Sequence, residues 1–316
     1  MRTSFVLSLS ALLLLVSCGD EPSSNADGAD ETPVATSIAG VSVSGEFGAT
    51  PDVSIDSPVS VEQTTVETLS EGDGDEIAKG DTVIVDYVGL LGRTGDQFDS
   101  SYDRGQPATF DTTGVLPGIS QAVEGQTVGS RVVVGVAPAD GFGAQGQPDA
   151  GIEGDDTLVF VIDVVARALP EAAGEKQDLP PSLPQLQLDD NGQPTKFATT
   201  KQVEDAPDTL QAEVVVTGDG PEVETGQTLL AHYVGQIYPD GSVFDSSWAD
   251  GAPASFPIGV GQVIPCWDNA LVGQTVGSRV ILVCPPEEGY GETGNPQIGV
   301  KPTDTLIFSV DILAVY

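Results

Sequence analysis

Short apolar runs rich in valine and isoleucine recur along the chain, and clusters of glycine, proline, aspartate and asparagine separate them. Runs of this length with partial two-residue alternation are typical of β-strands. Six of them stand out, at residues 82–87, 131–136, 158–165, 228–233, 279–284 and 306–314. Two further stretches, 117–123 and 265–271, begin with proline, which a first helical turn tolerates, and each predicts one short helix. The pattern therefore predicts an α+β fold that is mostly β.

The chain contains the same unit twice. GQTVGSRV at 125–132 recurs unchanged at 273–280, and FDSS at 98–101 recurs at 244–247. Matched positions lie 146 residues apart early in the unit and 148 apart later, so the loop between Phe256 and Val263 is two residues longer in the second copy. A repeat of this length is a complete domain with its own core rather than a solenoid element.

The repeat divides the chain into domains. We expect a first domain at 40–167 and a second at 187–316, each a curved antiparallel sheet wrapped over one short helix. Residues 168–186 include the run LPPSLP, and this proline content predicts a semi-rigid, extended linker.

Composition narrows the classes of function. The chain has 11 Lys and Arg against 48 Asp and Glu, a formal net charge of −37, so phosphate backbones would repel it. We therefore expect no nucleic-acid binding. One His and three Cys leave too few soft ligands for a zinc cluster, and we expect neither a metal nor a cofactor.

The N-terminus indicates export. The apolar run at 5–16 follows Met1 and Arg2 and is too short to span a bilayer as a helix. It ends in LVSC at 15–18, which resembles a bacterial lipobox, so we expect residues 1–17 to be a lipoprotein signal peptide and Cys18 to carry the lipid. The alternative is an ordinary signal peptide followed by an incidental cysteine. Residues 18–39 lack apolar periodicity and predict a disordered acidic tether, with the protein anchored to the outer face of the cell membrane.

Several motifs follow one another in a fixed order in the second copy. Tyr233 precedes FDSS by ten intervening residues, and then come VIPCW at 263–267, GYGETGNP at 289–296 and TLIFSV at 305–310. Together they resemble the FKBP-type peptidyl-prolyl cis-trans isomerase family, and the resemblance extends over nearly all of both copies. Tandem FKBP-like domains on an acidic lipoprotein are also similar to exported proteins of actinobacteria.

The resemblance implies an apolar, aromatic-lined pocket between the sheet and the short helix of the second domain. Seven residues would surround or orient the X-Pro amide: Tyr233, Phe244, Asp245, Ile264, Trp267, Tyr290 and Phe308. Phe256, Val263 and Ile298 would extend the contact with the substrate. By the same resemblance, Trp267 would form the floor under the proline ring. The backbone N–H of Ile264 and the hydroxyl of Tyr290 would donate to substrate carbonyls. Asp245, held by Tyr233, would face the rotating carbonyl.

The same positions in the first domain give a degenerate pocket. They are Tyr87, Phe98, Asp99, Phe110, Val115, Leu116, Ile119, Phe142 and Phe160. Ile119 replaces the tryptophan and Phe142 the tyrosine, while Arg104, matched by Asp250 in the second copy, is placed to pair with Asp99. We therefore expect most of the isomerase activity in the second domain.

Two cysteines are specific to the second copy. Cys266 and Cys284 are matched by Gly118 and Val136 in the first, so both thiols are absent together. In an exported chain, paired absence indicates a disulfide, and the alternative is two buried free thiols. A bridge would hold Trp267 against the sheet.

The lone histidine has no predicted catalytic part. His232 neighbours Tyr233 on a predicted strand, so their side chains point to opposite faces, and we expect His232 at the surface or at a sheet edge.

Three functions compete. The leading one is a peptidyl-prolyl isomerase that assists the folding of exported proteins, with proline-containing extended segments as partners and a monomer as the expected state. The second is a non-catalytic chaperone or protein-binding module that uses the same pocket, which Ile119 and Phe142 favour for the first domain. The third is a structural adhesin of two β domains, which would need no concave aromatic pocket.

Overall fold

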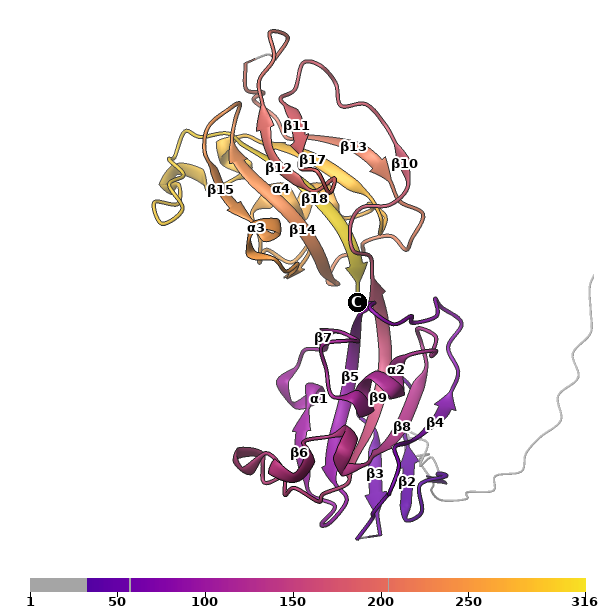
Figure 1. Cartoon of the computed structure of the whole chain (residues 1–316). Coiled ribbons are helices and arrows are strands. Elements are labelled where there is room, and N and C mark those ends of the chain that lie inside the picture. Colours follow the sequence, from indigo (N-terminus) through magenta and orange to yellow (C-terminus); the bar gives the residue numbers. More distant parts are fainter. Residues whose placement is uncertain (1–32, 57, 204) are drawn as a thin grey trace, which may run out of the picture. The chain divides into compact units, whose positions relative to one another are not determined.

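The computed structural model describes residues 33–56, 58–203 and 205–316 (Figure 1). Each repeated unit forms one large antiparallel sheet, and two smaller sheets accompany them. The prediction of a mostly β, α+β fold with two such domains is confirmed. The predicted signal peptide, Cys18 and most of the predicted tether lie outside the described residues.

The sheet of the first domain has the strand order β4-β8-β9-β5-β6, and β7 also pairs with β5. Its strands are β4 (Thr65–Ser70), β5 (Thr82–Leu91), β6 (Gln97–Ser100), β7 (Ala108–Asp111), β8 (Arg131–Val136) and β9 (Leu158–Ala168). Two α-helices, α1 (Ser101–Arg104) and α2 (Pro117–Val123), and three 3-10 turns, η1 (Pro138–Asp140), η2 (Gly143–Gln145) and η3 (Pro148–Ala150), connect them. The bounds of α2 and β8 are those that the sequence predicts.

The second domain repeats this order with one added edge strand, as β10-β13-β17-β18-β14-β15 with β16 on β14. Its strands are β10 (Glu175–Lys176), β13 (Gln211–Thr217), β14 (Thr228–Ile237), β15 (Val243–Ser246), β16 (Ala254–Pro257), β17 (Arg279–Cys284) and β18 (Leu306–Val315). The helices are α3 (Ser247–Asp250) and α4 (Pro265–Leu271), and the 3-10 turns are η4 (Pro286–Glu288) and η5 (Gly291–Thr293). Here α4 and β17 match their predicted bounds.

The central strands are buried on both faces, which explains their continuous apolar runs. On one face of the first sheet lies the core under α2, and on the other Val133, Val159 and Val161 meet a cover formed by the preceding chain. That cover is a three-stranded sheet of β1 (Val34–Ala35), β2 (Val41–Ser44) and β3 (Asp52–Ile55). Because β1 and the buried Ile38 belong to it, the folded chain begins before residue 40, where the tether is predicted to end.

The second sheet has a cover of its own. The hairpin of β11 (Gln185–Leu188) and β12 (Pro194–Ala198) and the proline-rich segment before it place Leu183 and Phe197 against Ile281 and Ile307. Leu183 is only 5% exposed, and β10 pairs with β13 at the sheet edge. The segment predicted as an extended spacer is thus largely part of the second domain, because its leucines bury the outer face of the sheet.

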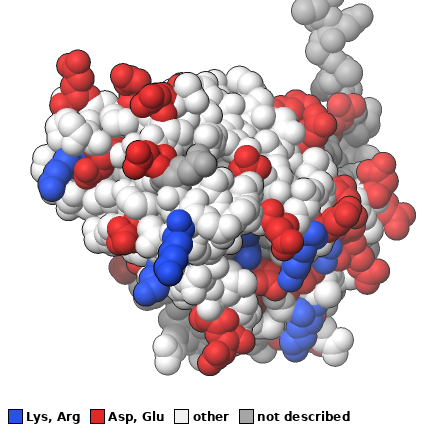
Figure 2. All heavy atoms as spheres, turned by 90° about the horizontal axis from the view of Figure 1, so that it is seen from above, with Lys and Arg blue, Asp and Glu red and all other residues white. Residues whose placement is uncertain are grey.

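Acidic side chains are spread over the face of the molecule drawn in Figure 2, with a smaller number of Lys and Arg between them. Within the described part of the chain, no group of His, Cys, Asp and Glu is arranged to hold a metal ion. None of the helices among those residues combines the length and apolar character needed to cross a bilayer.

Candidate functional site

A cavity of about 450 Å³ lies between the sheet and α4 in the second domain. Its lining residues come from β14, β15, β16 and β18, from α4 and the loop before it, and from the η4–η5 loop. They are Tyr233, Phe244, Asp245, Phe256, Gln262, Val263, Ile264, Pro265, Trp267, Gly289, Tyr290 and Phe308. The cavity therefore brings together residues that are distant in the sequence.

Trp267 is the centre of the aromatic lining. Its ring packs edge-on against three others, with centroid distances of 5.4 Å to Tyr233, 4.9 Å to Phe256 and 5.6 Å to Phe308. Phe244 meets Phe308 at 5.7 Å and 85°. Edge-to-face pairs of this kind fix one another's orientation, so the cavity wall is preformed.

A glycine in β14 allows two of these rings to lie over the strand. A Cβ atom on Gly235 would come within 2.8 Å of both Phe244 and Phe308. Real Cβ atoms do not approach so closely, so any other residue here would displace the wall of the cavity. Gly89 has the same relation to Phe98 and Phe160 in the first domain.

The polar side chains of the cavity include two phenols, Tyr233 and Tyr290, and one carboxylate, Asp245. The Tyr233 hydroxyl donates to Oδ2 of Asp245 at 2.8 Å, as predicted. Burial, followed by this hydrogen bond and the charge of Asp245, raises the pKa of Tyr233 well above its usual value. Burial also raises the pKa of Tyr290, although Asn295 opposes it. Both phenols therefore remain protonated hydrogen-bond donors at neutral pH.

The loop before α4 is held by the helix itself. The Asp268 carboxylate accepts the backbone N–H groups of Gly259 and Gly261, each at 2.7 Å. Both glycines have positive φ, +78° and +76°, which side-chain-bearing residues rarely adopt. These two hydrogen bonds fix the position of Val263 and Ile264 at the start of the helix. Among the described residues, the Ile264 N–H has no hydrogen-bond partner and is free to donate to a ligand.

All the predicted pocket residues of the second domain line this cavity except Ile298, which packs against the domain core instead. Gln262, Pro265 and Gly289 line it without having been predicted. Each is a chain neighbour of a predicted residue, so adjacency to VIPCW and GYG is the signal that identifies them.

The first domain has a matching cavity of about 590 Å³. All nine predicted positions line it, and five further residues join them: Val85, Ala108, Gly114, Pro117 and Ile162. Three of these were recognisable by two-residue periodicity, since Val85, Ala108 and Ile162 lie two positions from Tyr87, Phe110 and Phe160 on the same strand faces.

The two cavities differ at the floor. In the second domain Trp267 covers the strand residues beneath it, and Ala231 and Val310, the counterparts of Val85 and Ile162, lie in the closed core. In the first domain the smaller Ile119 leaves Val85 and Ile162 to form the floor. The first cavity is accordingly larger, and it lacks the flat indole surface. It also lacks the hydroxyl of Tyr290, because Phe142 stands at that position.

The cavities also differ in charge. In the first domain the Arg104 guanidinium pairs with Asp99, donates to the Tyr87 hydroxyl at 3.1 Å and lies 5.3 Å from the centre of that ring. The Tyr87 hydroxyl in turn donates to Asp99. The predicted Arg104–Asp99 pair is therefore present, and it neutralises the pocket carboxylate.

Comparison with known proteins assigns the fold. The sequence profile of FKBP-type peptidyl-prolyl cis-trans isomerases matches residues 74–165 and 220–313, more than half of the chain and one segment in each repeated unit. The chain belongs to this family. The two large sheets with their cavities are thus tandem FKBP domains, and the predicted resemblance is confirmed.

Two relatives match over about the length of one FKBP domain. An FK506-binding protein of Streptomyces anulatus is 44% identical over 98 residues, which are 31% of this chain and 79% of that protein. Peptidyl-prolyl cis-trans isomerase Fkbp12 of Drosophila melanogaster is 38% identical over 107 residues, 34% of this chain and 97% of that protein. Among solved structures, the three FKBP domains of wheat FKBP73 give 24% identity and a TM-score of 0.36, covering 80% of this chain and 94% of that one.

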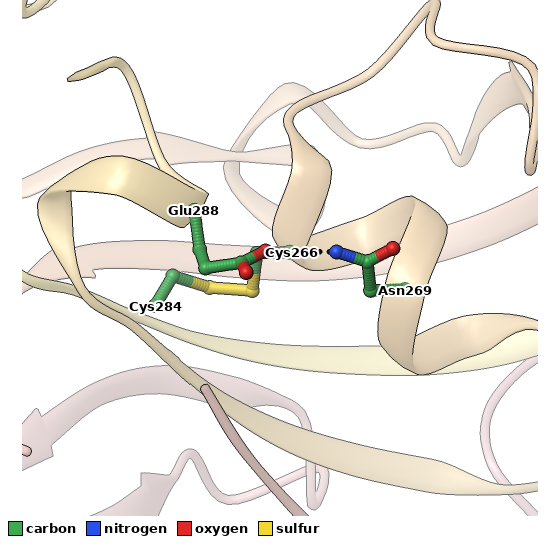
Figure 3. The surroundings of a disulfide bond; sticks show 4 residues. All are labelled: Cys266, Asn269, Cys284 and Glu288. Atoms are coloured by element: carbon green, nitrogen blue, oxygen red, sulfur yellow. Dashed lines mark hydrogen bonds between the residues drawn. A yellow bond between two sulfur atoms is a disulfide. The ribbon is translucent and has the colours of Figure 1, made fainter. Parts of the chain in front are cut away.

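A disulfide joins α4 to β17 in the second FKBP domain, as predicted (Figure 3). Cys266 and Cys284 have Cα atoms 5.7 Å apart, and beside them Asn269 donates to Glu288 at 2.9 Å. In the first domain the same space is closed by packing, since a Cβ on Gly118 would lie 2.3 Å from Val136. The bridge therefore fixes the helix that carries Trp267.

Removing the bridge should destabilise the second domain. We expect the double variant Cys266→Gly, Cys284→Val, which recreates the packing pair of the first domain, to lower the free energy of unfolding by about 3 kcal/mol. Both tryptophans lie in the second domain, so a denaturant titration followed by tryptophan fluorescence measures that domain. Reductant should lower the denaturation midpoint of the wild type and leave that of the variant unchanged. An insensitive wild type would contradict the structural role of the bridge.

His232 lies inside the second domain, which corrects the prediction of a surface or edge position. It is 8% exposed, its ring stacks on Trp248 at 3.8 Å, and its Nδ1 is 2.9 Å from Oγ of Ser247. The prediction failed because strand alternation shows that His232 lies on the face opposite Tyr233, but it does not show what packs over that face. Here α3 folds over that face and carries the tryptophan.

The buried histidine makes stability depend on pH. Burial lowers the pKa of His232 below its ordinary 6.5, against the opposing charge of Asp311. Near and below pH 6.5 the unfolded chain therefore binds more protons than the folded chain. The contribution of neutral His232 to the free energy of unfolding is thus complete above that pH and falls on acidification. We expect the wild type to lose more stability between pH 7.5 and 5.5 than His232→Gln. The variant keeps every carboxylate, so it measures the pH dependence that the carboxylates cause. Equal losses in the two proteins would contradict this.

Proposed function

We propose that this chain catalyses cis-trans isomerisation of X-Pro bonds in extended or unfolded polypeptide, mainly in the second FKBP domain. The observation that carries the proposal is the cavity around Trp267, which combines aromatic walls with two phenol donors and one carboxylate. The relatives named as peptidyl-prolyl isomerases support it.

The chemistry needs no nucleophile. Rotation about a peptide bond has a barrier of about 18–20 kcal/mol, because resonance is lost when the amide twists. The twisted amide has less charge separation than the planar one, so an apolar cavity stabilises the transition state more than the ground state. The indole of Trp267 supplies a flat apolar floor for a proline ring, and Phe244 and Phe308 wall it.

The polar groups orient the substrate. The free Ile264 N–H and the Tyr290 hydroxyl are donors for carbonyls on either side of the proline. Asp245, held by Tyr233, would face the twisting amide and disfavour the partial negative charge that resonance places on the carbonyl oxygen of the planar form. Holding the flanking chain in this way converts binding energy into a lower barrier.

The first domain serves as a binding module in this proposal. Its larger apolar cavity, without the indole floor and the second hydroxyl, is suited to holding an apolar side chain of an extended segment. In this respect the alternative of a non-catalytic chaperone applies to the first domain, while the second performs the turnover.

Export and membrane anchoring form part of the proposal. The apolar N-terminal run and the lipobox-like LVSC support processing to a lipid-modified Cys18 at the outer face of the cell membrane. There the protein would act on exported chains as they fold. Mass spectrometry of the N-terminal peptide from a membrane fraction tests this, and an unmodified Cys18 would refute it.

A refolding assay tests the proposed activity. In a substrate protein whose slow folding phase is X-Pro isomerisation, catalytic amounts of the full chain should accelerate that phase and leave fast phases unchanged. A slow phase that responds only to stoichiometric amounts would instead support the non-catalytic alternative.

A further inference from the structure

The pocket carboxylate of the second domain lacks the cation that its counterpart has. In the first domain Arg104, the last residue of α1, pairs with Asp99. In the second domain the residue at the end of α3 is Asp250, five positions after Asp245. The substitution places a negative charge where the first domain has its cation, and this charge adds to the raised pKa of Tyr233, which lines the cavity.

Among the described residues of the second domain, no lysine or arginine forms a salt bridge with Asp245 or Asp250. Residues 187–316 contain Lys196, Lys201, Arg279 and Lys301, and Arg279 is buried in a pair with Asp311. That pair is the one salt bridge formed within the described residues of this domain. Further carboxylates follow along the η4–η5 loop, at Glu287, Glu288 and Glu292, where Gly289 and Tyr290 reach the cavity.

The cavity itself has an unsatisfied donor. Trp267 is 4% exposed and lines the cavity, and its indole N–H is buried without a hydrogen-bond partner among the residues that the structure describes. Because protein atoms enclose this nitrogen, a bound chain meets the indole as an apolar surface, and the charged group of the cavity is the carboxylate of Asp245. This carboxylate has no paired cation among the described residues of the domain.

We infer that the second FKBP domain selects prolines that have a lysine or arginine next to them, with Asp245 and Asp250 as the residues that set this preference. The inference rests on the proposed isomerase function and adds a substrate class to it. Arg104 removes the same preference from the first domain, because the cation is supplied by the protein.

The expected preference is moderate. At separations of about 7 Å in a water-exposed rim, two carboxylates should favour Lys over Glu by about tenfold in kcat/KM at low salt. Salt near 1 M shortens the Debye length to about 3 Å, so the ratio should fall to nearly one.

A peptide series measures this directly on the full chain. The peptides carry Lys, Gln or Glu directly before or directly after one proline, and NMR exchange between cis and trans isomers gives the rate without a coupling protease. We expect the order Lys, Gln, Glu in at least one series. In Asp250→Arg, which recreates the arrangement of the first domain, the Lys-to-Glu ratio should fall below about twofold, and Asp250→Asn should be intermediate.

Each result decides one point. Turnover of the Gln peptide with no difference between Lys and Glu overturns the charge preference but leaves the isomerase function intact. Turnover of none of the peptides contradicts the proposed function. In that case the affinities of the same peptides, measured by isothermal titration with wild type and Asp250→Arg, still test the preference.

Arg104→Asp is the matched control, and it should create a Lys preference in the binding of peptides to the first domain.

Discussion

Phe244→Ala should lower kcat/KM of the full chain for a Phe-Pro peptide by about tenfold or more. Phe244 forms a wall of the cavity and packs on Phe308, so its removal admits water to the place where the amide twists. Full burial of a phenylalanine side chain contributes about 1.5–3 kcal/mol of stabilisation. If half of the upper value is lost from the transition state alone, the rate falls by about a factor of ten.

The matched variant in the first domain is Phe98→Ala. Phe98 packs on Phe160 as Phe244 packs on Phe308, so the two truncations disturb equivalent cavities. We expect Phe98→Ala to change kcat/KM by less than about twofold, since the first cavity lacks the indole floor. A larger loss in Phe98→Ala than in Phe244→Ala would reverse the ranking of the domains. Unchanged denaturation midpoints establish that both variants remain folded.

Asp311→Ala should destabilise the second domain by about 3–5 kcal/mol. Asp311 accepts from Nε and a terminal nitrogen of Arg279 at 2.5 and 2.6 Å, between the neighbouring strands β18 and β17. Its side chain is 1% exposed and that of Arg279 is 9% exposed. Truncation leaves the guanidinium buried without its partner, which costs more than the pair contributes.

Tryptophan fluorescence isolates this effect, because Trp248 and Trp267 both belong to the second domain. The control is Asp163→Ala, which breaks the equivalent buried pair with Arg131 in the first domain. We expect the tryptophan transition to move to much lower denaturant in Asp311→Ala and to stay in place in Asp163→Ala. A transition that does not move in Asp311→Ala would contradict the structural role of the pair.

The sequence predicts what repetition and periodicity encode. The unchanged GQTVGSRV and FDSS segments define the two domains, and the proline-initiated helices have their predicted bounds. Paired absence of Cys266 and Cys284 from the first copy predicts the bridge. These features depend on local residue choices, which one sequence displays in full.

Other features depend on contacts between distant segments. Leu183 and Phe197 sit in proline-rich or polar stretches without strand periodicity, yet they cover the outer face of the second sheet. His232 is buried because Trp248, in the helix α3, stacks on its ring. Ile298 is predicted to contact the substrate, but it packs, partly buried, against the core and does not line the cavity. Alternation along a strand gives the face of a side chain and does not give what packs over that face.

The proposed isomerase activity is tested most directly by the cis-trans exchange rate of a Phe-Pro peptide, measured by NMR with catalytic amounts of the full chain. We expect exchange well above the uncatalysed rate in the wild type and in Phe98→Ala, and a strongly reduced rate in Phe244→Ala. Exchange at the uncatalysed rate in the folded wild type would contradict the claim that the Trp267 cavity lowers the barrier to rotation.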